Sequence, residues 1–247
     1  MKLKVIGSSS KGNSYLLDNG KECLAIECGI AFREVQKAVD FDISRIVGAV
    51  VSHEHGDHAK YARKFIEAQI PVYASHGTFE RLKLNNSHLI HPMDERSINV
   101  IGNFRVQPFK VQHDAAEPFG FLIHHPETGV VLFATDTYYL RYKFAGLNNI
   151  LIECNYRQDI LDANCEAGEI PEKLRERTMQ SHCSYETCRE ILLANNLSEV
   201  NNIVLIHLSG RNSDASAFRK GIAVLTGKTV YVAKPGLVID YFNKSPF

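Results

Sequence analysis

The sequence predicts an α/β fold in which two packed β-sheets carry helices on their outer faces. The chain has 247 residues, of which 45% are hydrophobic and 23% charged, as expected for a globular protein with a large core. Short β-rich runs alternate with helical runs in both halves of the chain. Two strand-rich halves with intervening helices predict a four-layer αββα sandwich. We expect residues 1–247 to form one domain.

The first half of the chain alternates strands with tight turns. "KLKVIG" and "SYLLD" lead through the hairpin-type turn Asn19-Gly20 into "CLAIECG". "AFREVQKAVDF" has apolar residues at helical spacing, and "IVGAVVS" is a continuous apolar run, typical of a strand buried on both faces. A helix "KYARKFIEAQ", a strand "PVYAS" and a helix "GTFERLK" follow.

The second half repeats this alternation. Two hairpins are predicted, "INVIGNFRVQPFKVQH" turning at Gly102-Asn103 and "FGFLIHHPETGVVLFATD" turning around 127–129. "NNILIECN" and "NNIVLIHLS" predict strands, and "DASAFRKGIAVLT" predicts a helix. "SYETCREILLANNL" predicts another helix, with Ser184 as its N-cap. We expect "TVYVAKPGLVIDY" to form a final hairpin.

Charge and composition narrow the function classes. Lys+Arg and Asp+Glu both number 28, whereas a protein that grips long nucleic acid through its phosphates usually has a basic excess. The sequence has no secretory signal pattern and no apolar run near the ~20 residues of a membrane span. We therefore expect a cytoplasmic protein without a membrane partner. The six cysteines form no CxxC, so we expect free thiols.

The stretch "VVSHEHGDHAK" concentrates metal-binding residue types directly after an apolar run. His53 and His55 are two positions apart, so both can reach one ion from a single loop. Asp57 and His58 follow closely enough to reach a second ion beside the first. Imidazole and carboxylate together suit Zn²⁺ or Mn²⁺ in a binuclear site.

One loop cannot complete two coordination shells. Three further candidates each stand at the end of an apolar strand: His113 in "FKVQHDAAEP", Asp136 in "VVLFATDT" and His207 in "IVLIHLSG". A lone His or Asp at a strand end is usually a satisfied polar residue. The recurrence of the same strand-then-ligand pattern favours ligands at all three positions.

These residues resemble the metallo-β-lactamase superfamily. "SHEHGDH" matches its HxHxDH motif, and the later positions match its further ligand motifs in order, over nearly the whole chain. "GSSSKGNSYLL" and "HLSGRN" resemble the RNase Z-like phosphodiesterase branch more than the glyoxalase branch. The resemblance implies the αββα sandwich and two divalent metal ions, Zn²⁺ before Mn²⁺. It places one ion on His53, His55 and His113 and the other on Asp57, His58 and His207, with Asp136 bridging both.

The resemblance also implies catalytic residues. His182 in "QSHCSYET" resembles the catalytic histidine of the RNase Z-like branch, which predicts a general acid or a phosphate contact. Asp57 is expected both to ligate a metal and to orient the nucleophile. The family usually has Asp ahead of a Gly in its first motif, where "AIECG" has Glu27. We expect Glu27 to orient a ligand imidazole.

Two small-residue turns are candidate substrate-binding loops. "GSSSKGNS" offers Ser9 and Asn13, although such a turn is also compatible with a plain connection. "HLSGRN" offers Ser209 and Arg211, and an arginine there can bind phosphate bidentately or form a surface ion pair. Asp114 and Glu117 in "HDAAEPFGF" line the pocket in one interpretation and are solvated turn carboxylates in the other.

Two groups of phosphodiesterases fit the motifs. The chain lacks the Gly/Pro-rich arm of tRNA-processing RNase Z enzymes, which argues against a bulky RNA substrate. It resembles phage anti-Pycsar proteins, homodimers that degrade the cyclic mononucleotides cCMP, cUMP, cAMP and cGMP. It also resembles YycJ-type proteins, regarded as DNA exonucleases, with which it shares "HDAAEP".

The neutral charge and compact chain favour the cyclic-nucleotide interpretation. It implies a small nucleotide substrate and a homodimer, located in the host cytoplasm if the gene is viral. Nucleic acid is a partner only in the exonuclease alternative. Tyr156 stands where the YycJ type has His, and either stacks on a base or packs in the core. A nucleotide-sequestering module and a thioester or lactam hydrolase are further alternatives on the same fold.

Overall fold

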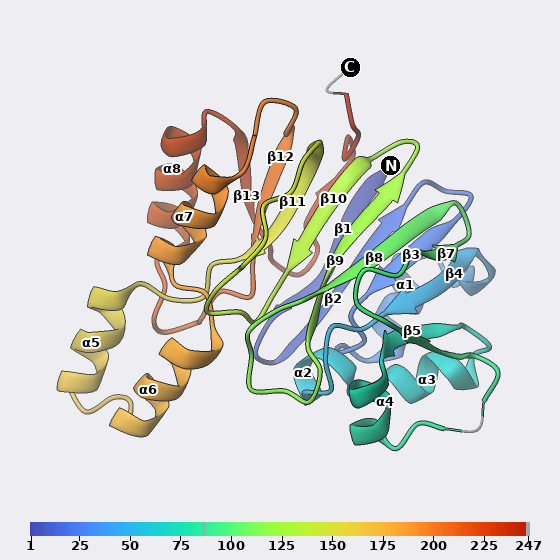
Figure 1. Cartoon of the computed structure of the whole chain (residues 1–247), viewed down its shortest axis with the longest axis horizontal. Coiled ribbons are helices and arrows are strands. Elements are labelled where there is room, and N and C mark those ends of the chain that lie inside the picture. Colours follow the sequence, from blue (N-terminus) through green and yellow to red (C-terminus); the bar gives the residue numbers. More distant parts are fainter. Residues whose placement is uncertain (86, 246–247) are drawn as a thin grey trace.

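The predicted α/β sandwich is confirmed. The structure, a computed structural model, describes residues 1–85 and 87–245 and contains two seven-stranded sheets packed face to face. Helices cover the outer faces of both sheets (Figure 1). The three hydrophobic layers between these four structural layers account for the apolar runs of the sequence.

The first sheet is built mainly from the N-terminal half, and its central strands are parallel. β3, β4, β5 and β6 run parallel to one another, while β1, β2 and β14 pair antiparallel. Its order across the sheet is β14 (Val238–Ile239), β1 (Lys2–Ser9), β2 (Gly12–Asp18), β3 (Cys23–Ile26), β4 (Ile46–Val50), β5 (Val72–Ser75) and β6 (Ile90–Met93).

The second sheet comes from the C-terminal half and has the same mixed character. β10, β11, β12 and β13 are parallel, and β7, β8 and β9 form an antiparallel meander against β10. Its order is β13 (Thr229–Val232), β12 (Asn202–Ile206), β11 (Leu147–Glu153), β10 (Gly129–Ala134), β9 (Phe119–His125), β8 (Phe104–Lys110) and β7 (Asn99–Ile101).

The helices fall into three groups. α1 (Phe32–Ala38), α3 (Ala62–Glu67) and α4 (His76–Leu82) contribute to the hydrophobic cluster on the outer face of the first sheet. α7 (Tyr185–Ala194) and α8 (Ala215–Thr226) do the same for the second sheet. Short segments η1 (Ile43–Arg45) and α2 (Gly56–Ala59) lie in loops, and α5 (Gln158–Glu166) and α6 (Glu172–Ser181) protrude at one corner (Figure 1).

The main core lies between the sheets, where alternate residues of facing strands interdigitate. Leu17 and Ile26 of the first sheet belong to the same buried cluster as Phe121, Phe133 and Val204 of the second. Burial of apolar surface on this scale is the dominant favourable term in folding. It also explains the double-sided burial of β4 and β12, whose outer faces pack under helices.

Most of the predicted elements are confirmed. The predicted hairpins are present at Asn19-Gly20, Gly102-Asn103 and 127–129. The Ser184 hydroxyl caps α7 by accepting a hydrogen bond of 3.0 Å from the Thr187 N–H. All six cysteines are free.

Two features of the C-terminal half differ from the prediction. The prediction of a final hairpin is wrong. β13 joins the second sheet beside β12, whereas β14 belongs to the first sheet and pairs with β1. The Val5 N–H donates to the Leu237 carbonyl, and the Gly236 N–H donates to the Val5 carbonyl, so this turn is held by the other sheet. The sequence pattern did not predict α5 and α6. Their surfaces are mostly polar and show little of the apolar periodicity that marks a buried helix.

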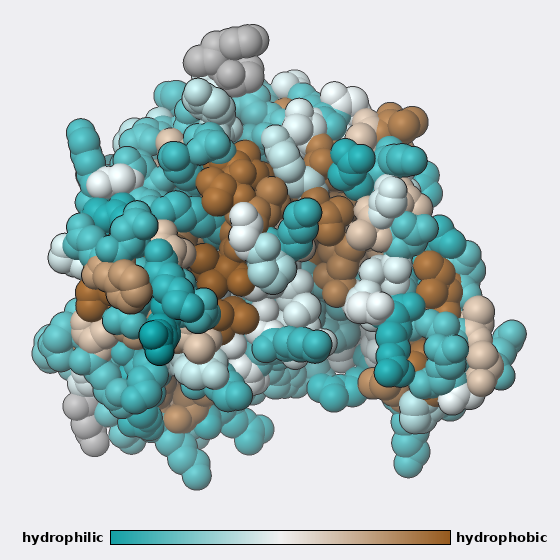
Figure 2. Space-filling model, turned by 180° about the vertical axis from the view of Figure 1, so that it is seen from behind, coloured by the Kyte–Doolittle hydropathy of each residue, from teal (hydrophilic) through white to brown (hydrophobic). Residues whose placement is uncertain are grey.

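The carboxyl ends of many strands meet at one edge of the sandwich. These are β3 and β4 of the first sheet and β8, β10, β11 and β12 of the second, as their pairings require. Seen from behind, this lower edge is hollowed between two protruding lobes (Figure 2). Among the described residues, no helix has the length and apolar character needed to cross a bilayer.

Candidate metal centre

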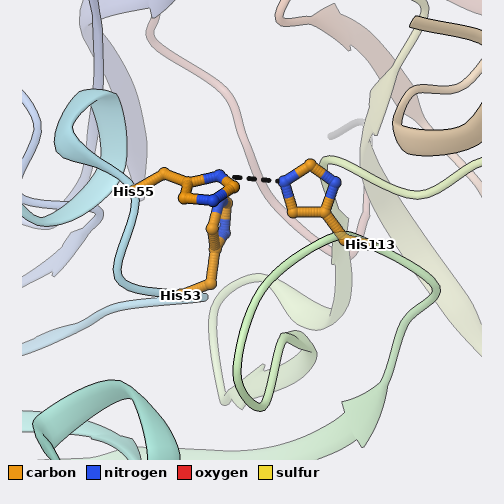
Figure 3. A group of neighbouring side chains, drawn as sticks. All are labelled: His53, His55 and His113. Carbon is orange, nitrogen blue, oxygen red and sulfur yellow. Dashed lines mark hydrogen bonds between the residues drawn. The ribbon is translucent and has the colours of Figure 1, made fainter. Parts of the chain in front are cut away.

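The three histidines His53, His55 and His113 converge from two segments of the chain. His53 and His55 lie in the loop after β4, and His113 lies in the loop after β8. Their imidazoles turn toward one another, and His113 Nε2 lies 3.1 Å from His55 Nδ1 (Figure 3). One nitrogen from each ring lies within 4.8 Å of the others, close enough for all three to contact one ion.

A second group forms beside the first from Asp57, His58, Asp136 and His207. Its ligand atoms also lie within 4.8 Å of one another. His207 Nε2 is 3.1 Å and His58 Nε2 is 3.3 Å from Asp57 Oδ2. The structure thus brings together all seven residues predicted as metal ligands, from four distant segments of the chain.

Asp136 occupies the position between the two groups. Its Oδ2 atom lies 3.4 Å from His58 Nε2 in one group and 3.4 Å from His113 Nε2 in the other. The same oxygen is 3.8 Å from His53 Nε2. This is the placement that a bridging carboxylate requires.

Three residues of the centre have left-handed backbone conformations. Glu27 follows β3 with φ 68°, Asp136 follows β10 with φ 46°, and His207 follows β12 with φ 53°. Non-glycine residues adopt this conformation at an energetic cost, and such residues cluster at functional sites. Each one turns its side chain out of the strand direction at the common sheet edge.

Two imidazole nitrogens that face away from the centre are held by neighbours. His53 Nδ1 is 2.9 Å from the Ser52 hydroxyl, and His113 Nδ1 donates to the Ser181 carbonyl at 2.8 Å. His58 Nδ1 lies 3.5 Å from Glu27 Oε1, and neither atom has a hydrogen-bond partner among the described residues. Glu27 therefore lies beside a predicted ligand imidazole without the hydrogen bond that would fix the ring, so its orienting role stays a prediction.

Glu153, which the sequence pattern did not single out, connects the centre to His182. Its Oε1 atom accepts hydrogen bonds from His182 Nδ1 at 2.8 Å and His207 Nδ1 at 3.0 Å. Its Oε2 atom accepts from the backbone N–H groups of Thr137 and Cys183. Glu153 stands at the end of β11, so the strand-end pattern that marks the ligands was the available signal.

His182 lies between two helices at the margin of the centre. It follows the last residue of α6 and precedes the Ser184 cap of α7. Burial lowers its pKa, but the Glu153 carboxylate raises it above the ordinary value. With Nδ1 bonded to Glu153, Nε2 remains for a ligand in the adjoining cavity, which His182 lines.

Asp57 and Asp136 both favour the ionised form, although Asp136 is buried and Asp57 is half-buried. Burial acts to raise the pKa of Asp57 and Asp136, yet the surrounding imidazoles hold both well below the usual range. Burial lowers the pKa of His207, but Asp136, Asp57 and Glu153 raise it to about 10. Positive charge is therefore favoured beside Asp57 and Asp136, whereas burial lowers the pKa of His53 and of His113, so that these imidazoles favour the neutral form that ligates metals.

The donor set fits divalent cations. His53 Nε2 is buried and, within the described residues, has no hydrogen-bond partner, although it faces Asp136 and His113. A buried nitrogen without a partner is costly unless something else satisfies it. Imidazole and carboxylate donors around this point match the preferences of Zn²⁺ and Mn²⁺.

Two connected cavities open at the centre. The inner cavity has about 190 Å³ and is lined by residues of the centre together with Ser10, Leu174, Arg177 and Thr178. A neighbouring cavity of about 440 Å³ shares His182 and His207 with it and continues along the loop at 208–212. We name the second one the side cavity.

The predicted substrate-binding residues have different placements. Ser209 and Arg211 line the side cavity, as a substrate contact requires. Asn13 is buried, and its Nδ2 atom lies 3.2 Å from His58 Nε2 and 3.4 Å from Asp57 Oδ2, so it contacts the metal-binding side chains directly. Ser9 accepts a hydrogen bond from the Lys11 N–H, and its neighbour Ser10 lines both cavities.

Tyr156 packs in the core and does not face a ligand. It is 4% exposed and belongs to a small cluster with Leu161 and Ile170 beneath α5 and α6. The stacking alternative for Tyr156 is therefore wrong, because its ring stabilises the base of these helices. Asp114 forms an ion pair with Arg177, and Glu117 accepts a hydrogen bond from the Gly77 N–H.

Comparisons with known proteins agree with this geometry. Residues 22–207 match the family described as the beta-lactamase superfamily domain. A Bacillus anthracis protein named exodeoxyribonuclease YycJ is 27% identical over 98% of this chain and 96% of its own length. Exodeoxyribonuclease WalJ of Streptococcus pneumoniae is 26% identical over 86% of this chain and 83% of its own. These relatives confirm the resemblance to YycJ-type proteins.

A solved structure shows the same fold. The metallo-beta-lactamase fold protein YhfI from Bacillus subtilis superposes with a TM-score of 0.74 at 18% identity. The match covers 96% of this chain and 98% of that protein. The likeness therefore extends over both sheets and their helices.

Proposed function

This chain belongs to the metallo-β-lactamase superfamily as a metal-dependent hydrolase, and on this basis we propose that it hydrolyses a phosphodiester bond in a nucleotide substrate. The observation that carries the proposal is the Glu153–His182 pair beside the metal centre. Hydrolysis of a phosphodiester needs an activated nucleophile, which metal ions can supply, and a proton for the leaving oxygen. The chain offers residues for both requirements at one cavity.

We propose that the seven convergent side chains hold two divalent ions. His53, His55 and His113 would hold one, and Asp57, His58 and His207 the other, with Asp136 between them. Such ions lower the pKa of water and neutralise charge on phosphate oxygens. Zn²⁺ is the expected ion and Mn²⁺ the second choice, so elemental analysis should find two ions per chain.

The protein's own residues then carry the remaining steps. Asp57, held by His207 and His58, is positioned to orient the nucleophile. The Glu153 carboxylate raises the pKa of His182, which favours the imidazolium with a proton on each nitrogen. Nδ1 donates to Glu153, and Nε2 gives its proton to the leaving oxygen. Because His182 lines the side cavity, the departing part of the substrate would leave on that side.

We propose a 3′,5′-cyclic mononucleotide as the substrate. The inner and side cavities have about 190 and 440 Å³, which suits one small ligand of the size that such sites usually hold, about 300–1,000 Å³. Equal numbers of acidic and basic residues support the same choice. The expected reaction opens the cyclic ester to a nucleoside monophosphate, which would remove a cyclic-nucleotide immune signal if the gene is viral.

A DNA exonuclease is the second candidate. The curated relatives named exodeoxyribonucleases match nearly the full chain, which favours this alternative. It replaces the small substrate with the end of a DNA strand and keeps the same metal and proton chemistry. In both cases we propose a homodimer, which light scattering on the purified protein would test.

One experiment separates these possibilities. The Zn²⁺- or Mn²⁺-loaded protein is incubated with cCMP, cUMP, cAMP and cGMP and, separately, with short single-stranded DNA, and the products are analysed. Nucleoside monophosphates from the cyclic substrates support the first candidate. Shortened DNA without cyclic-nucleotide turnover supports the second. Hydrolysis of a thioester or nitrocefin, with bis(p-nitrophenyl) phosphate left intact, would overturn the phosphodiesterase proposal.

A further inference from the structure

A large cavity adjoins the metal centre at His113, and none of its described lining residues lines the side cavity. It has about 780 Å³ and is lined by residues near His113, by Tyr138 and by one face of α6. We name it the outer cavity. The chemistry described above does not use it.

α6 presents two cations to the outer cavity. Lys173 and Arg177 are four residues apart, so they lie on one face of the helix, and Ser181 follows on the same face one turn later. The Ser181 carbonyl accepts from His113 Nδ1 at 2.8 Å. This hydrogen bond fixes the end of α6 against the metal centre, and with it the position of Arg177.

Arg177 also reaches the inner cavity, which Lys173 does not line. Among the described residues lining the inner cavity, Arg177 is the one lysine or arginine. Arg211, predicted to bind phosphate, lines the side cavity instead. The permanent cation at the inner cavity therefore comes from α6.

The guanidinium group of Arg177 is only partly engaged. Its Nε atom donates to Asp114 Oδ2 at 3.1 Å, and its side chain is 62% exposed. Within residues 1–85 and 87–245, its two terminal nitrogens have no hydrogen-bond partner. An exposed ion pair of this kind contributes little to stability, so Arg177 can leave Asp114 at small cost.

We propose that Arg177 is a substrate-binding residue that exchanges Asp114 for the phosphate group held at the metal centre. Its planar fork of N–H donors matches two phosphate oxygens, which a lysine cannot do. Asp114 keeps the side chain extended beside the centre until an anion arrives. This assignment rests on the proposed phosphodiesterase function and applies to both candidate substrates.

The test compares R177A, R177K and K173A in the metal-loaded protein with bis(p-nitrophenyl) phosphate. R177A should raise KM about tenfold to a hundredfold, the range of a lost charge-assisted contact, with kcat changed far less. R177K should recover part of the loss. K173A removes the same charge from the same helix face and should change KM by less than about twofold. An equal effect of K173A and R177A would overturn the assignment.

D114N separates binding from a structural role. It removes the charge that pairs with Arg177 and should lower KM, whereas a purely structural pair predicts the same increase in KM for D114N and R177A. Because Asp114 Oδ1 also lies 3.4 Å from His113 Nε2, the variants are compared at equal metal content. Calorimetric titration with inorganic phosphate gives a readout independent of turnover: R177A should weaken binding about tenfold or more. If the wild type binds phosphate but cleaves no phosphodiester, the proposed function fails. The comparison of phosphate binding by the wild type and R177A still tests the role of Arg177 in that case. If R177A binds phosphate as the wild type does, the assignment fails.

Discussion

Replacing Glu153 by glutamine should disrupt the connection between the metal centre and His182. Four donors converge on this buried carboxylate: His182 and His207 on Oε1, and the Thr137 and Cys183 backbone N–H groups on Oε2. A carboxylate accepts on both oxygens, whereas a carboxamide has one oxygen and one NH₂ group. Whichever way the amide introduced by E153Q turns, its NH₂ group faces two of these four donors, which then lack an acceptor.

The size of the effect follows from this count. A buried donor without an acceptor costs about 1–3 kcal/mol, so E153Q should lower the free energy of unfolding by about 2–6 kcal/mol. If the NH₂ group faces the imidazoles, turnover should also fall, because the loss of a partner that orients a ligand usually costs about 10–100-fold in activity or metal affinity. Urea unfolding, metal content and kcat with bis(p-nitrophenyl) phosphate measure the three quantities.

A matched control is available on the surface. Glu166 at the end of α5 is exposed, so E166Q makes the same chemical change without a buried partner. It should stay within about 0.5 kcal/mol of the wild type. An E153Q protein with wild-type unfolding free energy and wild-type turnover would refute the role assigned to Glu153.

Three further predictions concern the acid, a packed glycine and an ion pair remote from the centre. H182A should keep its metal content while kcat falls about 10²–10⁴-fold, the usual contribution of a general acid; unchanged turnover would remove His182 from the mechanism. G29A should lose activity and metal affinity, because a Cβ at Gly29 would overlap the Asp57 carbonyl and displace the histidine loop; a structure of the variant with an unmoved loop would contradict this interpretation. Burial opposes ionisation of Asp18, but hydrogen bonds from Lys4 and the Gly20 N–H and the charges of Lys4 and Arg45 lower its pKa. The ion pair therefore stabilises the fold above the unfolded pKa of about 3.9, and that contribution is lost as the pH falls through the lower folded value. D18N should lower the free energy of unfolding by about 2–3 kcal/mol at pH 7, and its deficit should shrink in acid; a deficit independent of pH between 7 and 2 would show that the charge is not responsible.

The metal-binding side chains could be found in the sequence because each one follows an apolar strand. Parallel strands bring their carboxyl ends to one edge, so a repeated strand-then-ligand pattern already implies that the ligands meet. His113, Asp136 and His207 obey this rule, and the loop 53–58 follows β4 in the same way. The layers of the sandwich could be predicted for a similar reason, since buried strands and amphipathic helices have distinct apolar patterns.

Other parts of the site depend on contacts between residues far apart in the chain. Glu153 matches the strand-end pattern, but its two imidazole partners lie 29 and 54 residues away, so its role follows only from their positions in space. The sequence predicted a turn and a substrate contact at Asn13, yet Asn13 lies in β2 and its amide faces Asp57 and His58, 44 and 45 residues later. Arg177 belongs to no sequence motif, and the role proposed for it depends on the packing of α6 against His113.

The amino-acid sequence alone was enough to establish the fold class, the family resemblance and the identity of the side chains that form the centre, because these depend on local periodicity and on motifs within single loops. The three-dimensional arrangement was needed to show which carboxylate holds His182, which cation faces the inner cavity, and how the last two strands divide between the sheets. Those outcomes depend on pairings across the two sheets and on the free energy of burying polar groups with partners, which no local pattern of residues encodes.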